Sequence, residues 1–364
     1  MKILCIAGAR PNFMKIAPLM RAFAAEPGIE PVLVHTGQHY DEKMSDLFFR
    51  QLEIPEPDIN LGCGGGSHAQ QTAAIMTAFE PVVLEHKPNA VLVVGDVNST
   101  IACGLVAVKL GVKLIHVEAG LRSFDRTMPE EINRVLTDSI SDLLFCTEQS
   151  GADNLRRERI AEDKIHLVGN VMIDTLLRNR EKAELTSILE DMGIEPRGFA
   201  VVTLHRPANV DDPQTLVGLV DVLDAVQTDM PVIFPIHPRT FKHLAANGLK
   251  ERVDGMSNLR LVEPIGYLEF LKLIANARIV LTDSGGIQEE TTILKVPCLT
   301  LRENTERPIT CQLGTNRLVG TKPGLIIAAY RETIANGVNC GKTPPLWDGR
   351  AAERIARIIV EQMV

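Results

Sequence analysis

The segment AVLVVGDVNSTIACGLVAVKLGVKLIHVEAG, residues 90–120, contains one full repeat of the pattern that runs through this chain. Its first part, Ala90–Gly95, is a short apolar run rich in β-branched valine, which is typical of a buried strand. Thr100–Leu110 then has the pattern of a helix, and Val112–Val117 is a second apolar run. Because strands buried on both faces have continuous apolar runs, this order predicts two parallel strands joined by a helix.

The same alternation continues through most of the chain. Strands are expected at Ile3–Ala7, Pro31–Thr36, Ala90–Gly95, Val112–Val117, Leu143–Thr147, Ile165–Val168, Phe199–Leu204, Pro231–Ile236, Leu259–Val262, Ile279–Asp283, Pro297–Leu301 and Arg317–Val319. Helices are expected at Ile16–Ala25, Gln71–Glu85, Thr100–Leu110, Pro129–Ser139, Thr215–Ala225, Tyr267–Asn276 and Gly286–Leu294. Such alternation predicts an α/β fold, in which helices cover both faces of parallel sheets.

The alternation is interrupted once, between residues 170 and 197, by a charged, helix-like stretch. A fresh series of strands follows it. We therefore expect two doubly wound, Rossmann-like lobes, formed by residues 1–169 and 170–349. An amphipathic helix over residues 350–364 follows them. The pattern alone fits a helix that covers the second lobe equally well as one that returns to the first.

Composition is ordinary for a globular enzyme and excludes several classes of function. Of the 364 residues, 45% are hydrophobic and 23% charged, and the formal net charge is −8. This acidic balance, with only 4% aromatic residues, argues against a general nucleic-acid binder. The chain has no unbroken apolar run of the roughly 18–20 residues that a membrane span needs. We expect neither nucleic acid nor a membrane as a partner.

The cysteines and histidines lack the spacing of metal ligands. The seven cysteines form no C-x-x-C pair, and the nine histidines form no H-E-x-x-H motif. Cys5, Cys146 and Cys298 lie in apolar runs, where cysteine behaves as a small hydrophobic residue. We expect a reduced, cytoplasmic protein without a structural metal.

Polar residues follow the expected strands at their carboxyl ends. Asp96 and Glu118 follow two strands of the first lobe, and His205, His237 and Asp283 end or follow strands of the second. Ligands of open α/β sheets bind beyond the carboxyl ends of the strands. Several strands that end in polar side chains therefore predict a ligand-binding cleft between two such lobes.

Two strand-to-helix turns have the composition of phosphate sites. Gly8–Arg10 ends the first strand, with Lys15 one turn later, and Ser284–Gly286 opens a helix whose free N–H groups suit a diphosphate. Neither turn is a Walker A or G-x-G-x-x-G motif, which argues against an NTPase or a nicotinamide dehydrogenase. The alternatives are a plain turn with Pro11 near the helix start, and a helix start capped by Asp283 or by the serine after it.

Three carboxylates are candidates for acid/base chemistry. Asp96 has the alternative role of a helix cap, whereas Glu118 directly follows an apolar strand, which argues against a surface role. Glu130 and Arg134 are spaced i,i+4, so taken alone they predict an exposed ion pair worth about 0.3–0.5 kcal/mol. In the second lobe, Glu290 lies one turn inside a helix, where it could accept hydrogen bonds from ribose hydroxyls.

Six motifs in this order resemble those of the non-hydrolysing UDP-N-acetylglucosamine 2-epimerases. They are GARPNFMK (8–15), GDVNST (95–100), HVEAGLRSFDRTMPEEINR (116–134), HRPANVD (205–211), LTDSGGIQEE (281–290) and ENTERP (303–308). The resemblance runs nearly end to end. It implies the glycosyltransferase B-type fold, with the nucleotide sugar in the cleft between the lobes, a C-terminal helix that returns to the first lobe, and a homodimer.

The resemblance also implies a role for each matched residue. Asp96, Glu118 and Glu130 would be the catalytic carboxylates, and Arg134 and His205 would stabilise charge around the sugar and the leaving group. The residues that would hold the diphosphate and the rest of UDP are Arg10, Lys15, His237, Phe270, Ser284, Gly285, Gly286, Glu290 and Arg307.

The implied activity is C2 epimerisation of UDP-N-acetylglucosamine to UDP-N-acetylmannosamine, with elimination of UDP, a 2-acetamidoglucal intermediate and re-addition. It requires no metal or other cofactor. Relatives that act on UDP-2,3-diacetamido uronic acids look similar, so the sugar stays open. A hydrolysing 2-epimerase that releases N-acetylmannosamine, a glycosyltransferase of the same fold and a non-catalytic nucleotide-sugar sensor also stay open.

Overall fold

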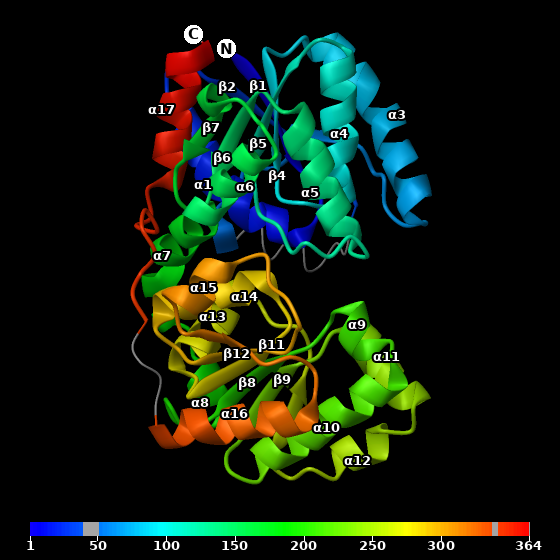
Figure 1. Ribbon diagram of the computed structural model, residues 1–364, viewed down its shortest axis with the longest axis vertical. Coiled ribbons are helices and arrows are strands. Elements are labelled where there is room, and N and C mark those ends of the chain that lie inside the picture. The colour runs from blue at the N-terminus through cyan, green and yellow to red at the C-terminus, as the bar shows by residue number, and fades with distance from the viewer. Residues whose placement is uncertain (39–50, 337–340, 364) are drawn as a thin grey trace. The chain divides into compact units, whose positions relative to one another are not determined.

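The computed structural model describes residues 1–38, 51–336 and 341–363 (Figure 1). The chain divides into two compact units, which we call unit 1 (Met1–Arg178 with Pro345–Val364) and unit 2 (Asn179–Pro344). The division falls inside helix α7 (Val171–Glu184), whereas the sequence pattern predicts a boundary at residues 169 and 170. The first turns of α7 are held in unit 1, where the Thr175 hydroxyl donates to the carbonyl of Met14 at 2.6 Å.

Unit 1 is built on a parallel sheet, to which the described residues contribute seven strands in the order β3-β2-β1-β4-β5-β6-β7. The strands are β1 (Lys2–Ala7), β2 (Glu30–His35), β3 (Ile59–Asn60), β4 (Ala90–Val94), β5 (Lys113–Val117), β6 (Leu143–Cys146) and β7 (Ile165–Leu167). The direction in which strands are added reverses between β1 and β4. The turns that follow these two strands therefore diverge, which leaves room for a ligand at this edge of the sheet.

Helices cover both faces of this sheet. They are α1 (Arg10–Ala24), α3 (His68–His86), α4 (Asn98–Lys109), α5 (Pro129–Ile140), α6 (Gln149–Arg157), η1 (Glu162–Lys164), α7 and α17 (Ala351–Met363). Their ends follow local chemistry: Ser67 and Gln70 form a reciprocal capping box at the start of α3. Helices α3, α4 and α5 pack side by side (Figure 1). The side chains between α3, α4 and the strands are aliphatic and aromatic, for example Phe79, Val93 and Val106.

The last helix, α17, belongs to unit 1 and packs against α1 (Figure 1). The Asp174 carboxylate caps its first turn, since it accepts from the backbone N–H groups of Ala351 at 3.1 Å and Ala352 at 2.7 Å. Just before this helix, the indole of Trp347 donates to the carbonyl of Thr147 at 2.9 Å. The structure therefore places this helix in unit 1, whereas the sequence pattern alone fits either unit.

Unit 2 has a second parallel sheet, with six strands in the described residues, in the order β10-β9-β8-β11-β12-β13. Its strands are β8 (Ala200–Thr203), β9 (Val232–Pro235), β10 (Leu259–Val262), β11 (Ile279–Thr282), β12 (Cys298–Thr300) and β13 (Asn316–Leu318). Its helices are α8 (Ile188–Met192), α9 (Pro207–Val210), α10 (Pro213–Gln227), α11 (Pro238–Ala246), α12 (Lys250–Asp254), α13 (Tyr267–Asn276), α14 (Gly285–Leu294), α15 (Pro308–Gln312) and α16 (Pro323–Asn336).

The two parallel sheets confirm the predicted α/β fold class. The helix-like stretch after residue 170 is two helices, α7 and α8, rather than one. The two-residue strand β3 is too short to show a pattern in the sequence. Across the part of the chain that the structure describes, no helix is both long and apolar enough to span a membrane.

Candidate active site

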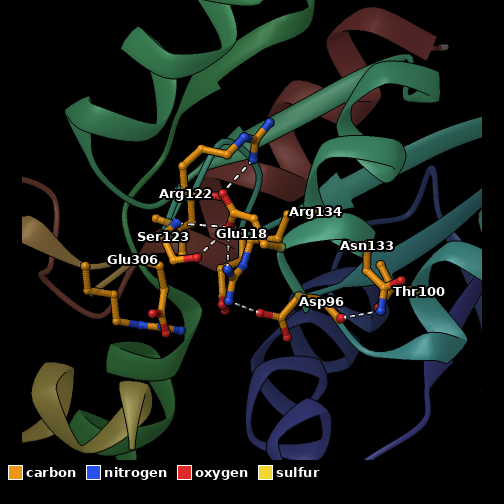
Figure 2. A network of polar contacts seen from close by, with 12 residues as sticks. Asp96, Thr100, Glu118, Arg122, Ser123, Asn133, Arg134 and Glu306 are labelled. Atoms are coloured by element: carbon orange, nitrogen blue, oxygen red, sulfur yellow. Dashed lines mark hydrogen bonds and ion pairs between the residues drawn. The ribbon is translucent and has the colours of Figure 1, made fainter. Parts of the chain in front are cut away.

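The turn after β4 places Asp96 beside a buried arginine. Gly95 has a φ of +68°, a conformation that favours glycine, and a Cβ at this position would lie 2.9 Å from the Nζ of Lys15. Arg134 donates from Nη2 to the Oδ2 of Asp96 at 2.5 Å, and Asn133 donates to its backbone carbonyl at 2.9 Å (Figure 2). No side chain caps the start of α4, so the structure does not support the alternative role of Asp96 as a helix cap.

Glu118, directly after β5, is buried and strained. Its side chain forms an ion pair with Lys15, and the two residues are 3% and 6% exposed. Its φ is +75°, a left-handed conformation that is costly for any residue other than glycine. A buried carboxylate held in a strained turn is typical of functional sites. The surface role for Glu118 is therefore excluded.

On α5, the structure places Glu131 rather than its neighbour at the centre of a polar network. Glu131 accepts from Arg134 Nη1 at 2.8 Å and from the backbone N–H groups of Ser123 and Phe124, both at 2.9 Å. The spacing alone predicts an exposed i,i+4 ion pair between Glu130 and Arg134. This prediction is wrong, because Arg134 is 3% exposed and forms a buried i,i+3 ion pair with Glu131. Glu130 itself is half-buried one turn before Arg134.

The structure therefore brings Asp96, Glu118, Lys15 and Arg134 together at the carboxyl ends of β4 and β5. Glu131 is not among the residues that the sequence pattern predicts, although it stands beside Glu130 in the same motif. Arg10 is the first residue of α1, and its side chain lies outside the part of the structure that is described.

In unit 2, His205 is held by the fully buried Asp283. The Nδ1 of His205 lies 2.9 Å from an Asp283 oxygen, and Asp283 also accepts from the N–H of Arg206 at 2.9 Å and from Asn209 Nδ2 at 3.2 Å. Burial raises the pKa of Asp283, but His205 and the backbone donors outweigh it and bring the net pKa below its usual value. Asp283 thus orients His205 and does not cap α14, which has no side-chain cap.

The N-terminus of α14 lies against Arg307. A Cβ on Gly285 would come within 2.5 Å of Arg307 Nη1, so glycine allows the guanidinium to approach the backbone here. Arg307 is buried, and it donates to Glu289 at 2.6 Å and to Glu306 at 2.5 Å. The first-turn N–H groups of a helix attract anions, whereas the charge of Arg307 is already matched by these two carboxylates, so a role for Arg307 in binding a diphosphate stays a prediction.

The other predicted UDP contacts lie at separate points of unit 2. Phe270 is half-buried on α13, and the exposed His237 precedes α11, where its Nδ1 accepts from the N–H of Arg239 at 3.1 Å. Ser284 and Gly286 flank Gly285 at the start of α14. A role for all of these residues in binding one UDP molecule stays a prediction.

Glu290 is a buried carboxyl with spare hydrogen-bonding capacity. Burial raises its pKa to about 8; the hydrogen bond with Tyr267 opposes this rise, and nearby Glu289 adds to it. Within the described part of the chain, the Oε1 of Glu290 has no hydrogen-bond partner. A group of this kind suits a hydroxyl-bearing ligand such as a ribose.

The raised pKa of Glu290 predicts a pH-dependent stability. The folded protein holds this proton up to about pH 8, whereas the unfolded chain releases it near the ordinary pKa of 4.5, so stability falls as pH rises between the two values. Glu290→Gln should remove this loss, which is on the order of 1.4 kcal/mol per pKa unit. Denaturant unfolding across this pH range, with the exposed Glu251→Gln as control, measures it. A parent-like slope in Glu290→Gln would contradict the prediction.

No group of three or more His, Cys, Asp and Glu side chains in the described ranges is arranged to hold a metal ion. The polar clusters of both units consist instead of carboxylates paired with arginine, lysine or histidine.

Comparisons with known proteins agree along the whole chain. A family model described as UDP-N-acetylglucosamine 2-epimerase matches residues 21–360. A UDP-N-acetylglucosamine 2-epimerase of Methanocaldococcus jannaschii is 44% identical over 364 residues, 99% of each chain. A crystal structure of a UDP-GlcNAc 2-epimerase from that organism, in complex with UDP-GlcNAc and UDP, has a TM-score of 0.93 and covers 99% of this chain and 100% of its own.

Two further proteins mark the range of the similarity. A UDP-2,3-diacetamido-2,3-dideoxy-D-glucuronate 2-epimerase of Pseudomonas aeruginosa is 41% identical over 367 residues, which cover 99% of this chain and 100% of the relative. A sucrose-phosphate synthase of Thermosynechococcus elongatus shares the fold alone, with a TM-score of 0.62 at 13% identity over 98% of this chain and 94% of its own.

Proposed function

The chain belongs to the UDP-N-acetylglucosamine 2-epimerase family, and from this membership we propose that it is an isomerase that interconverts UDP-N-acetylglucosamine and UDP-N-acetylmannosamine. The observation that carries the proposal is the pair of carboxylates at adjacent strand ends, Asp96 after β4 and Glu118 after β5, each held by a buried cation. Inversion at one carbon needs acid/base groups for both faces of the sugar.

The chemistry explains why a base alone is insufficient. The C2–H bond of the sugar is not next to a carbonyl, so it is barely acidic. In the proposed route the C1–O bond breaks first and UDP leaves with the bonding electron pair. C2 then loses its proton, which gives a 2-acetamidoglucal. A proton is added to the opposite face of C2 and the UDP oxygen adds back to C1, so the atoms of substrate and product are the same.

We assign the proton transfers to unit 1. Asp96, Glu118 and Glu130 would be the acid/base groups, and each such group typically contributes about 10²–10⁴-fold to the rate. Lys15 and Arg134 hold Glu118 and Asp96 in place, and Arg134 would also stabilise charge around the sugar.

We assign recognition of UDP mainly to unit 2. His205, oriented by Asp283, and the α14 N-terminus with Arg307 would stabilise the departing diphosphate, as preorganised donors do in other enzymes. Glu290 would accept hydrogen bonds from the ribose, and Phe270 and His237 would complete the UDP contacts. Arg10, from its matched motif, would be a further contact of the diphosphate.

Isotope exchange tests this proposal. Purified protein incubated with UDP-N-acetylglucosamine in D₂O should form UDP-N-acetylmannosamine that carries deuterium at C2, as seen by NMR. Product that retains the original hydrogen would exclude the elimination route. Free N-acetylmannosamine beside UDP would indicate a hydrolysing enzyme. Transfer of the sugar to an added acceptor, with no new UDP-sugar in its absence, would favour a glycosyltransferase.

A second candidate substrate is a UDP-2,3-diacetamido uronic acid. It is favoured by the 41% identity to the Pseudomonas aeruginosa relative, which is close to the 44% identity of the Methanocaldococcus jannaschii enzyme. The same elimination and re-addition would serve both sugars. The ratio of kcat/KM for the two substrates, measured with one preparation, decides between them.

We further propose a homodimer in the cytoplasm. Support for the dimer comes from exposed apolar side chains on α3, α4 and α5, namely Leu84, Val108, Ile132 and Leu136. Support for a reducing compartment comes from the described cysteines, which are free thiols. Light scattering should give twice the chain mass, and Leu136→Asp should shift it towards the monomer.

A further inference from the structure

A buried histidine lies directly beneath the two candidate catalytic turns. His116 is on β5, two residues before Glu118, and is 0% exposed. Its Nε2 lies 2.9 Å from the carbonyl oxygen of Gly95, the residue before Asp96. Its Nδ1 lies 2.7 Å from an oxygen of Asp138 on α5. A carbonyl oxygen only accepts, so Nε2 carries a proton that it donates to Gly95.

Asp138 connects His116 to the turn after β5, which contains Glu118 and Gly120. It is 0% exposed, and its other oxygen accepts from the backbone N–H of Gly120 at 3.0 Å and pairs with Arg122 at 2.7 Å. Burial raises the pKa of Asp138, but the contacts with His116 and Arg122 outweigh it and lower the net pKa. Asp138 therefore stays a carboxylate, which connects the His116 ring to the Gly120 amide.

The pair thus bridges the backbone on both sides of the candidate carboxylates. One end holds the carbonyl before Asp96, and the other holds the amide two residues after Glu118. Gly95, Glu118 and Gly120 all have left-handed φ values, of +68°, +75° and +79°. Turns of this kind have few ways to relax, so the length of the bridge determines where the two side chains project.

We propose that His116 and Asp138 are positioning residues for the epimerisation, which set the separation of Asp96 and Glu118. This inference rests on the proposed function. Neither residue reaches the sugar, because both are fully buried. A buried ion pair is a weak source of stability, since desolvation offsets its attraction. Placement of the acid/base groups explains why charged side chains occupy these core positions.

The test follows what becomes of the glucal intermediate. Protonation of its C2 on one face regenerates the substrate, and protonation on the opposite face gives the product. In D₂O, deuterium in recovered substrate and in product measures the two routes. His116→Gln can reach only one of the two bridge partners, so it should change the product-to-substrate labelling ratio about tenfold. It should also lower kcat on the order of 10²-fold, as small displacements in active sites do, while the Kd for UDP changes less than about threefold.

The controls separate positioning from stability and from function. His166→Gln, on β7, should keep the parent ratio and rate. Loss of folded protein lowers both labelling rates equally, so an unchanged ratio in His116→Gln would overturn the inference. A parent protein that exchanges no deuterium would instead overturn the proposed function.

Asp138→Asn provides the second variant if His116→Gln does not fold. Its side-chain oxygen can accept from Gly120 while its amide contacts the Nδ1 of His116, so the bridge is not broken, but it loses its short, charge-assisted hydrogen bonds and lengthens. Its labelling ratio should change in the same direction as in His116→Gln, but by a smaller factor. A parent-like ratio in every variant that folds would refute the positioning role.

Discussion

Glu118→Gln and Asp96→Asn should each lower kcat by about 10²–10⁴-fold while the Kd for UDP stays within about threefold of the parent value. The substitutions keep the size of each side chain but remove its ability to exchange a proton. UDP affinity should survive, because the residues assigned to UDP lie mainly in unit 2, whereas both carboxylates are in unit 1. Steady-state kinetics and UDP titration calorimetry measure the two quantities.

The exposed Glu85→Gln on α3 is the matched control and should behave as the parent. Near-parent turnover in both carboxamide variants would show that the acid/base groups lie elsewhere. An equal loss of turnover and UDP binding would indicate a damaged fold rather than a lost proton carrier. The deuterium assay adds a further distinction, since a variant blocked on one face of C2 can still label the other.

Lys15→Met should destabilise the protein by about 3–5 kcal/mol, the usual cost of removing one partner from a buried ion pair. Glu118 is 3% exposed, so after the substitution its charge stays buried without the lysine beside it. The double variant Lys15→Met/Glu118→Gln should recover much of this loss, since neither buried charge then remains. Denaturant unfolding of the parent, both single variants and the double variant gives the coupling energy.

Lys250→Met provides a comparison at the surface. Lys250 pairs with Asp254 across one turn of α12, and both side chains are half exposed. Exposed pairs contribute about 0–1 kcal/mol, so this variant should unfold close to the parent. If Lys15→Met were no more destabilising than Lys250→Met, the prediction that breaking the buried Lys15–Glu118 pair costs about 3–5 kcal/mol would be wrong.

Much of the architecture follows from local pattern. The apolar runs around residues 90–120 predict β4, α4 and β5, and Asp96 and Glu118 follow from their places after the strands. Contacts between distant segments do not follow in this way. Asp283 has the local pattern of a helix cap, yet it binds the backbone and ring of His205, which lies 78 residues away.

Adjacent residues on a helix are equally hard to separate by pattern. Glu130 and Glu131 differ by one position, and which of them faces the polar network depends on the rotation of α5, which tertiary packing sets. His116 lies inside an apolar run, so its alternation with valine and isoleucine predicts only a strand. Its bridging role depends on Gly95 and Asp138, one on each side of it in the chain.

The packing of α17 in unit 1 has a consequence for how the protein is made. The ribosome synthesises every residue of unit 2 before α17 emerges, so unit 1 must wait for its final helix. Until then, the surface that covers Ile355 and Ile359 is open to water, and Asp174 lacks the helix N–H groups from which it later accepts. Nascent chains in this interval expose an apolar patch that chaperones would bind.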